Sequence, residues 1–89
     1  MVKVVTPGTS VQGPDIRLLP GETVSIRQRR HASTRTGYVA FSRNTVRNTA
    51  TRIEMGNNDS MNGLKLENFN EAWFDATAAN TEFEMTGVA

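Results

Sequence analysis

The chain has 89 residues, a formal net charge of +1 and no cysteine. A chain of this length holds one domain, and the lack of cysteine excludes a disulfide framework, a thiolate metal site and a cysteine nucleophile. Its apolar runs are too short for a membrane span, which needs about 20 residues, and Pro7 and Gly8 follow too early for a secretory signal. We therefore expect stability to come from packing and association.

The first twenty residues are broken by three Gly/Pro pairs, at 7–8, 13–14 and 20–21. Glycine and proline are the strongest local interruptions of regular structure. Residues 1–20 are therefore predicted to form an extended N-terminal arm with at most short edge strands. Their apolar side chains have little local core to enter, so we expect the arm to order on contact with a neighbour. Residues 21–89 are predicted to form a single β-domain.

Apolar residues in the rest of the chain recur every second position, which is the period of a half-buried strand. Thr, Asn and Ser make up 24 of the 89 residues, which also suits short strands and turns. The pattern predicts an all-β fold, namely a small antiparallel β-sandwich or open barrel of six to eight short strands. The alternating pairs are Val24 and Ile26, Val39 and Phe41, Ile53 and Met55, Leu64 and Leu66, and Phe83 and Met85.

Local signals also place the turns. Pro20-Gly21 fits the centre of a type II turn, because proline fixes the first φ and glycine accepts the positive second one. Residues 56–59 are expected to form a loop, and Asn62-Gly63 predicts a hairpin turn just before Leu64. The alanine-rich segment 70–79 permits a helix, but Trp73 and Phe74 favour a strand, and we predict a strand there.

Charge is divided unevenly along the chain. Residues 1–52 hold nine basic against two acidic side chains, a net +7, whereas residues 53–89 hold one against seven, a net −6. Three arrangements would account for this: a basic face for nucleic acid, basic and acidic strands side by side in one sheet, or a basic face that meets an acidic face of another subunit.

Catalytic and metal chemistry find little support. His31 is the single histidine, and its basic neighbours Arg29 and Arg30 favour a neutral loop residue over a general base. One histidine without cysteine cannot build a structural zinc site, and Asn57, Asn58 and Asp59 lack the spacing of a calcium loop. We expect no enzyme activity, no metal and no cofactor.

Nucleic-acid binding is the main alternative from another functional class. Arginines crowd residues 27–52, and Tyr38 and Phe41 lie among them, a mixture that single-strand binders use. Residues 35–41 only partly follow the RNA-binding RNP1 pattern, and the two helices of that fold are missing from the sequence. We therefore do not expect a nucleic-acid partner. The arginines are Arg27, Arg29, Arg30, Arg35, Arg43, Arg47 and Arg52.

Trp73 and Phe74 are adjacent on a predicted strand, so their side chains point to opposite faces of the sheet. Both cannot enter the same core. Their adjacency predicts that at least one of them lies on a surface that a second subunit could cover.

From Thr36 to Val88, five motifs follow one another: Gly37-Tyr38-Val39-Ala40-Phe41, Asn44-Thr45-Val46, Asn62-Gly63-Leu64-Lys65-Leu66, residues 72–79 and Thr81-Glu82-Phe83-Glu84-Met85. Their order resembles that of small β-domain decoration or cement-like capsid proteins of tailed bacteriophages. One departure is that Pro20-Gly21-Glu22 lies early in this chain, whereas the family commonly has a Pro-Gly-Glu type turn after the Gly-Leu strand.

The resemblance implies a non-enzymatic virion protein that binds the major capsid protein on the surface of the phage head after assembly in the host cytoplasm. Another virion part, such as a tail, fibre or head-tail joining protein, is the nearest alternative. The family also implies a homo-oligomer, a trimer or dimer, without a membrane partner. The residues expected to contact partners are Leu18, Leu19, Arg27, Arg29, Arg30, Arg43, Arg47, Arg52, Trp73 and Phe74.

Overall fold

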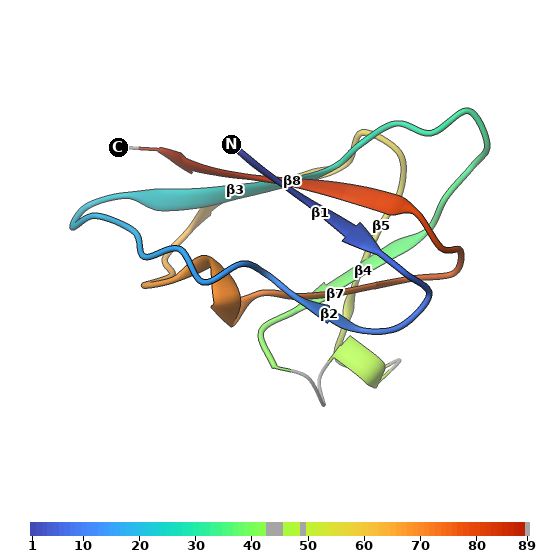
Figure 1. The fold of residues 1–89 in the computed structure, drawn as a ribbon, viewed down its shortest axis with the longest axis horizontal. Helices are drawn as coiled ribbons and strands as arrows, with labels where there is room; N and C mark the ends of the chain where they lie inside the picture. Colours follow the sequence, from blue (N-terminus) through green and yellow to red (C-terminus); the bar gives the residue numbers. More distant parts are fainter. Residues whose placement is uncertain (43–45, 49, 89) are drawn as a thin grey trace.

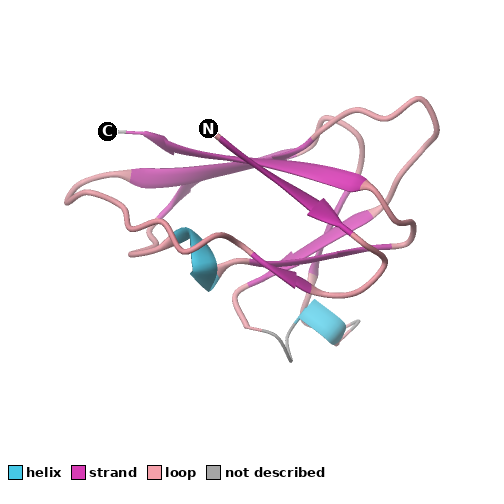
Figure 2. Cartoon of the chain, in the orientation of Figure 1, coloured by secondary structure: helices cyan, strands magenta, loops and turns pink. Residues whose placement is uncertain are grey.

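The computed structural model describes residues 1–42, 46–48 and 50–88, which fold into two packed antiparallel sheets (Figures 1 and 2). The predicted all-β sandwich is confirmed. One sheet has the strand order β1-β8-β3-β6 and the other β2-β7-β4-β5. The elements are β1 (Val2–Thr6), β2 (Val11–Gln12), β3 (Thr23–Gln28), β4 (Gly37–Ala40), β5 (Ile53–Met55), β6 (Ser60–Leu64), the 3₁₀ turn η1 (Phe69–Glu71), β7 (Trp73–Ala76) and β8 (Thr81–Val88).

The core lies between the two sheets and comes from the alternating apolar residues. Val24 and Ile26 of β3 and Phe83 and Met85 of β8 are fully buried, as the two-residue period predicts. The Phe74 ring of the opposite sheet packs against Phe83 with ring centroids 4.8 Å apart. Tilted aromatic pairs at this distance add stability beyond the area they bury.

The N-terminal segment 1–20 is not a free arm, and this prediction is corrected. β1 pairs with β8 over its full length, and β2 pairs with β7 in the other sheet. Val4 is buried in the core, so the apolar residues of this segment do find a core to enter. The partner strands lie more than 60 residues further along the sequence, and local signals cannot reveal such pairing. Only the expectation of short edge strands holds, because β1 and β2 are both outer strands.

Two predicted turns have different outcomes. Residues 19–22 form the expected turn, with Gly21 at φ +84° and the Glu22 N–H donating to the Leu19 carbonyl at 3.1 Å. Asn62-Gly63 is not a hairpin turn but lies inside β6. There the register with β3 shifts between Leu64 and Met61, and Gly63 has φ +71°. A positive-φ glycine serves a β-bulge as well as a turn, so the same dipeptide suits both.

The segment 70–79 contains the predicted strand as β7, preceded by the η1 turn. Asn68 caps this turn: its side chain accepts from the Asn70 N–H, and the Glu71 carboxylate accepts from the Asn68 N–H at 2.9 Å. This capping box satisfies backbone donors that a 3₁₀ turn leaves free. In β7, which follows this turn, Trp73 faces out and Phe74 faces the core.

Candidate partner-binding site

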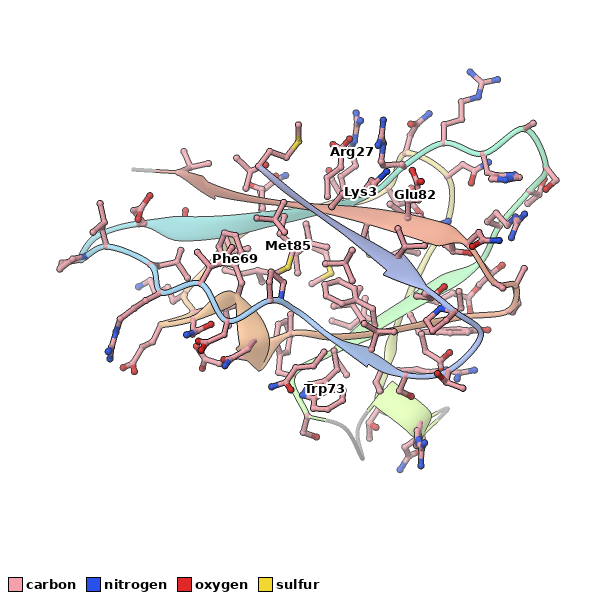
Figure 3. The ribbon with its side chains drawn as sticks, viewed as in Figure 1. Lys3, Arg27, Phe69, Trp73, Glu82 and Met85 are labelled. Atoms are coloured by element: carbon pink, nitrogen blue, oxygen red, sulfur yellow. The ribbon has the colours of Figure 1, made fainter. Side chains whose placement is uncertain are left out.

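The basic and acidic halves of the sequence meet on the outer face of the β1-β8-β3-β6 sheet (Figure 3). Arg27 lies 3.2 Å from Glu84, and Arg29 contacts both Glu84 at 3.0 Å and Glu82 at 3.4 Å. Lys3 on β1 reaches Glu82 at 3.4 Å. The arrangement with basic and acidic strands side by side in one sheet is therefore the one that the fold adopts. We call Lys3, Arg27, Arg29, Glu82 and Glu84 the charged row.

The cationic and acidic side chains of the charged row pair with one another. The Glu84 side chain is only 15% exposed and lies between two arginines, whereas the cationic side chains stay about half exposed. Exposed ion pairs contribute about 0–1 kcal/mol each, and a network of shared carboxylates lies towards the upper end. Arg27 and Arg29 were predicted partner contacts, but their charges are already engaged within the chain.

Among the described residues, the remaining predicted arginines belong to different parts of the fold. Arg30 is exposed two residues after the end of β3, and Arg47 is also exposed. Arg52 places its guanidinium 3.4 Å from the centroid of the Tyr38 ring, a cation–π contact on the β2-β7-β4-β5 sheet. Arg43 lies outside the described residues. Of the described arginines, Arg30 therefore follows a strand of one sheet and Arg52 contacts a side chain of the other.

His31 belongs to a hydrogen-bonded loop between β3 and β4. Its Nδ1 lies 3.0 Å from the Ser33 hydroxyl, and its Nε2 lies 3.1 Å from a guanidinium nitrogen of Arg35. Arg35 also donates to the Ala79 carbonyl at 2.6 Å. These contacts fasten the loop to the β7–β8 connection, which is a structural role for His31.

Two polar side chains in the same region, the buried Gln28 and the half-buried Asn57, had no signal in the sequence. The Gln28 amide donates to the Arg35 carbonyl at 2.9 Å, and the Asn57 amide donates to the carbonyls of His31 and Ser33. The side-chain oxygens of Gln28 and Asn57 are buried and have no hydrogen-bond partner among the described residues. Buried polar groups usually form hydrogen bonds, and here the side-chain NH2 groups form them with carbonyls of the β3–β4 loop. These two residues therefore hold that loop in place.

The adjacent aromatics Trp73 and Phe74 separate as predicted. Phe74 is fully buried in the core, so its prediction as a partner contact is wrong: the inward-facing position of β7 leaves it no surface. Trp73 is half-buried and points away from the core (Figure 3). Ala40, its register partner, and Val46 are both buried although neither belongs to the main core cluster. The chain therefore covers part of this outer face itself.

Apart from Met1, the most exposed large hydrophobic side chain among the described residues is that of Leu19, which is 70% exposed. It is the first residue of the turn 19–22, and its N–H donates to the Glu22 carboxylate at 2.6 Å. Leu18 points the other way, towards Gly87, and is half-buried. Val88, at the same end of the sandwich through its pairing with Thr23, is 47% exposed.

An open groove of about 320 Å³ lies beside this turn. Arg17, Glu22 and Glu67 supply charge along it, and Leu18, Leu19 and Leu66 supply apolar surface. The groove therefore has a mixed polar and apolar lining, and protein–protein contact surfaces combine both kinds of surface. We call the set Leu18, Leu19, Leu66 and Val88 the apolar end. Leu18 and Leu19 are the two sequence-predicted contacts that the fold brings together there.

Residues 1–42, 46–48 and 50–88 contain no group of three or more His, Asp or Glu side chains that could hold a metal ion. None of the helical segments described in the structure has the length and apolar character to span a bilayer. Comparison with protein-family models, with curated proteins and with solved structures gives no match for this chain. The surface geometry therefore carries the functional argument.

Proposed function

We propose that this chain is a non-enzymatic structural subunit that binds the assembled head of a tailed bacteriophage as a decoration protein. The observation that carries the proposal is the apolar end. Leu19 stands exposed on a turn that Gly21 and Glu22 hold in one conformation, so the chain loses little freedom when a partner covers it. The partner that the family resemblance implies is the major capsid protein, and the location that it implies is the outer surface of the virion.

The rest of the fold agrees with a binding role of this kind. A sandwich of short strands presents its connecting loops at two ends, which are natural places for contacts with a neighbour. The apolar end is one of these ends, and its polar rim of Arg17, Glu22, Lys65 and Glu67 offers charges of both signs. Such a rim fixes register with a partner more than it adds affinity.

Co-sedimentation with assembled heads tests the proposal. Heads built from the major capsid protein of the same genome are mixed with the purified chain, and bound protein is measured. Leu19→Asp is expected to lower affinity by about tenfold to a hundredfold, because it removes an exposed leucine side chain that the partner would cover. Thr9→Asp adds the same charge on the β1–β2 connection at the opposite end of the sandwich and is expected to bind as wild type (Figure 1). Equal binding by both variants, or none by the wild type, contradicts the proposal.

Nucleic-acid binding is weaker as a proposal because the arginines it needs are dispersed or engaged. Arg27 and Arg29 are paired with Glu82 and Glu84, and Arg52 stacks on Tyr38. A phosphate binder loses affinity steeply as salt rises. Titration of single-stranded DNA and RNA at about 50 and 200 mM salt separates the two functions: a steep salt slope supports nucleic-acid binding, and absence of binding at both salts supports the decoration role.

A further inference from the structure

The outer strands of the two sheets are unequal. β2 has two residues and runs into Gly13-Pro14, β5 has three residues, and β6 is interrupted by the bulge at Asn62-Gly63. β1 has five residues in unbroken register with β8 and contains no glycine, proline or bulge. Regular outer strands of this kind are ready to pair with another strand, and proteins usually blunt them.

The direction of the backbone groups of β1 follows from the neighbouring strands. The Arg29 N–H donates to the Glu82 carbonyl at 2.8 Å, so at Glu82 the backbone of β8 faces β3. In an antiparallel ladder, successive residues turn their N–H and C=O groups to alternate sides. Phe83 and Met85 therefore turn theirs to β1, where their register partners are Val4 and Val2.

It follows that Lys3 and Val5 direct their N–H and C=O groups away from β8, to the open side of the sheet. Both residues are exposed, and the Lys3 side chain is 50% exposed. Unpaired backbone groups in a row on an open edge are the template for adding a strand.

We propose that a second copy of this chain pairs with this edge, β1 against β1 in antiparallel fashion, about a two-fold axis at Val4. This register sets Lys3 of one copy opposite Val5 of the other, so residues with free backbone groups face each other at both symmetric positions. Each such pair exchanges two hydrogen bonds. The inference goes beyond the proposed capsid role and does not depend on it.

Other registers are less favourable for stated reasons. A shift by one residue sets free backbone groups against groups already bonded to β8. An axis at Lys3 places two lysines directly opposite each other, which is destabilising. An axis at Val5 sets Lys3 against Pro7, which has no N–H to donate. The axis at Val4 avoids the mismatched backbone groups, the opposed lysines and the pairing with Pro7. It also aligns the inward-facing Val4 side chains of the two copies.

Charge also fits the proposed pairing. On the outer face, Lys3 of one copy lies beside Val5 of the other, and the next residue across that sheet is Glu82. The order across the junction is therefore Arg29, Glu82, Val5 and then the lysine of the second copy. The added lysine extends the charged row with a cation near a carboxylate, and its aliphatic stem covers the partly exposed Val5.

Cross-linking tests the register. The chain has no cysteine, so a single introduced cysteine forms only a disulfide between copies. Val4→Cys is expected to cross-link under mild oxidation, because opposed residues of a non-hydrogen-bonded pair lie about 4.5 Å apart at Cα. Lys3→Cys and Val5→Cys, on the same strand, lie about 7–8 Å or more from their own copies and are expected to remain unlinked. Cross-linking of Lys3→Cys or Val5→Cys in place of Val4→Cys overturns the proposed register.

Light scattering on the purified chain tests the pairing itself. The wild type is expected at twice the mass of the 9.8 kDa chain. Val5→Pro removes an outward N–H but no bond to β8, so it is expected to weaken the dimer about tenfold or more with unchanged far-UV circular dichroism. A wild type that is monomeric at high concentration, or a folded Val5→Pro that associates as wild type, overturns the proposal; should Val5→Pro unfold, the cysteine series decides. No capsid is present, so the result is independent of the test of head binding.

Discussion

The two outer faces of the sandwich meet solvent in different ways. On the β1-β8-β3-β6 sheet, outward positions carry the charged row, in which Glu84 is shared by two arginines. On the β2-β7-β4-β5 sheet, the chain folds back so that Ala40 and Val46 are buried, and Arg52 stacks on Tyr38. The same alternation of residues therefore gives one face protected by ion pairs and one protected by covering chain. The second depends on apolar burial, so it is expected to respond more strongly to mutation.

The largest effect is expected at the core that both faces share. Phe74→Ala should lower the free energy of unfolding by about 3–5 kcal/mol, because it deletes a fully buried ring that packs on Phe83. Trp73→Ala, the neighbouring residue on the outer face, should cost about 1–2 kcal/mol, since the indole is only half-buried. Urea denaturation of both variants measures the difference. Equal losses would mean that the inward and outward positions of β7 are misassigned.

An intermediate effect is expected where the chain covers the outer face of the β2-β7-β4-β5 sheet. Val46 is fully buried although it lies outside the main core cluster, so Val46→Ala should cost about 1–3 kcal/mol. Arg47→Ala changes the exposed neighbour and should stay within about 0.5 kcal/mol. Thermal unfolding of the pair checks the covering arrangement, and a neutral Val46→Ala would show that the face is open.

The smallest effect is expected on the charged face. Glu84→Gln keeps the shape of the side chain and removes the charge shared by Arg27 and Arg29, with an expected cost of about 0.5–1 kcal/mol at low salt. In about 1 M salt, the difference from wild type should shrink, because screening weakens the pairs that the mutation removes. A loss as large as that of Val46→Ala would remove the contrast between the two faces.

Features of the fold that adjacent residues decide were predictable from the sequence. The period of β3 and β8 and the Pro20-Gly21 turn depend on the properties of adjacent residues, and both were predictable. The bulge at Asn62-Gly63 was misread because a positive φ at glycine is equally useful in a turn. The Asn-Gly pair predicts a positive φ at the glycine but not whether the flanking residues pair with a neighbouring strand.

Long-range pairing accounts for the other differences. The N-terminal strand finds its partner β8 only after the whole chain is made, so its apolar residues were assigned to an arm. The alternation of Trp73 and Phe74 indicated opposite faces but could not say which faced inward. For the candidate site, Leu19 was identifiable as an apolar residue beside a turn, whereas the pairing of Arg27 and Arg29 with Glu84 depends on strand order, which composition does not encode.

The bulge in β6 has a consequence for growth of the sheet. Growth of a fibril by strand addition requires two sheet edges on every copy that can pair with another strand. Each added copy then leaves one such edge free for the next. In the β1-β8-β3-β6 sheet, the side opposite β1 is β6, whose ladder is displaced at Gly63. When two copies pair through β1, the extended sheet ends in a bulged β6 strand on each side. Further copies are therefore not expected to add to this sheet.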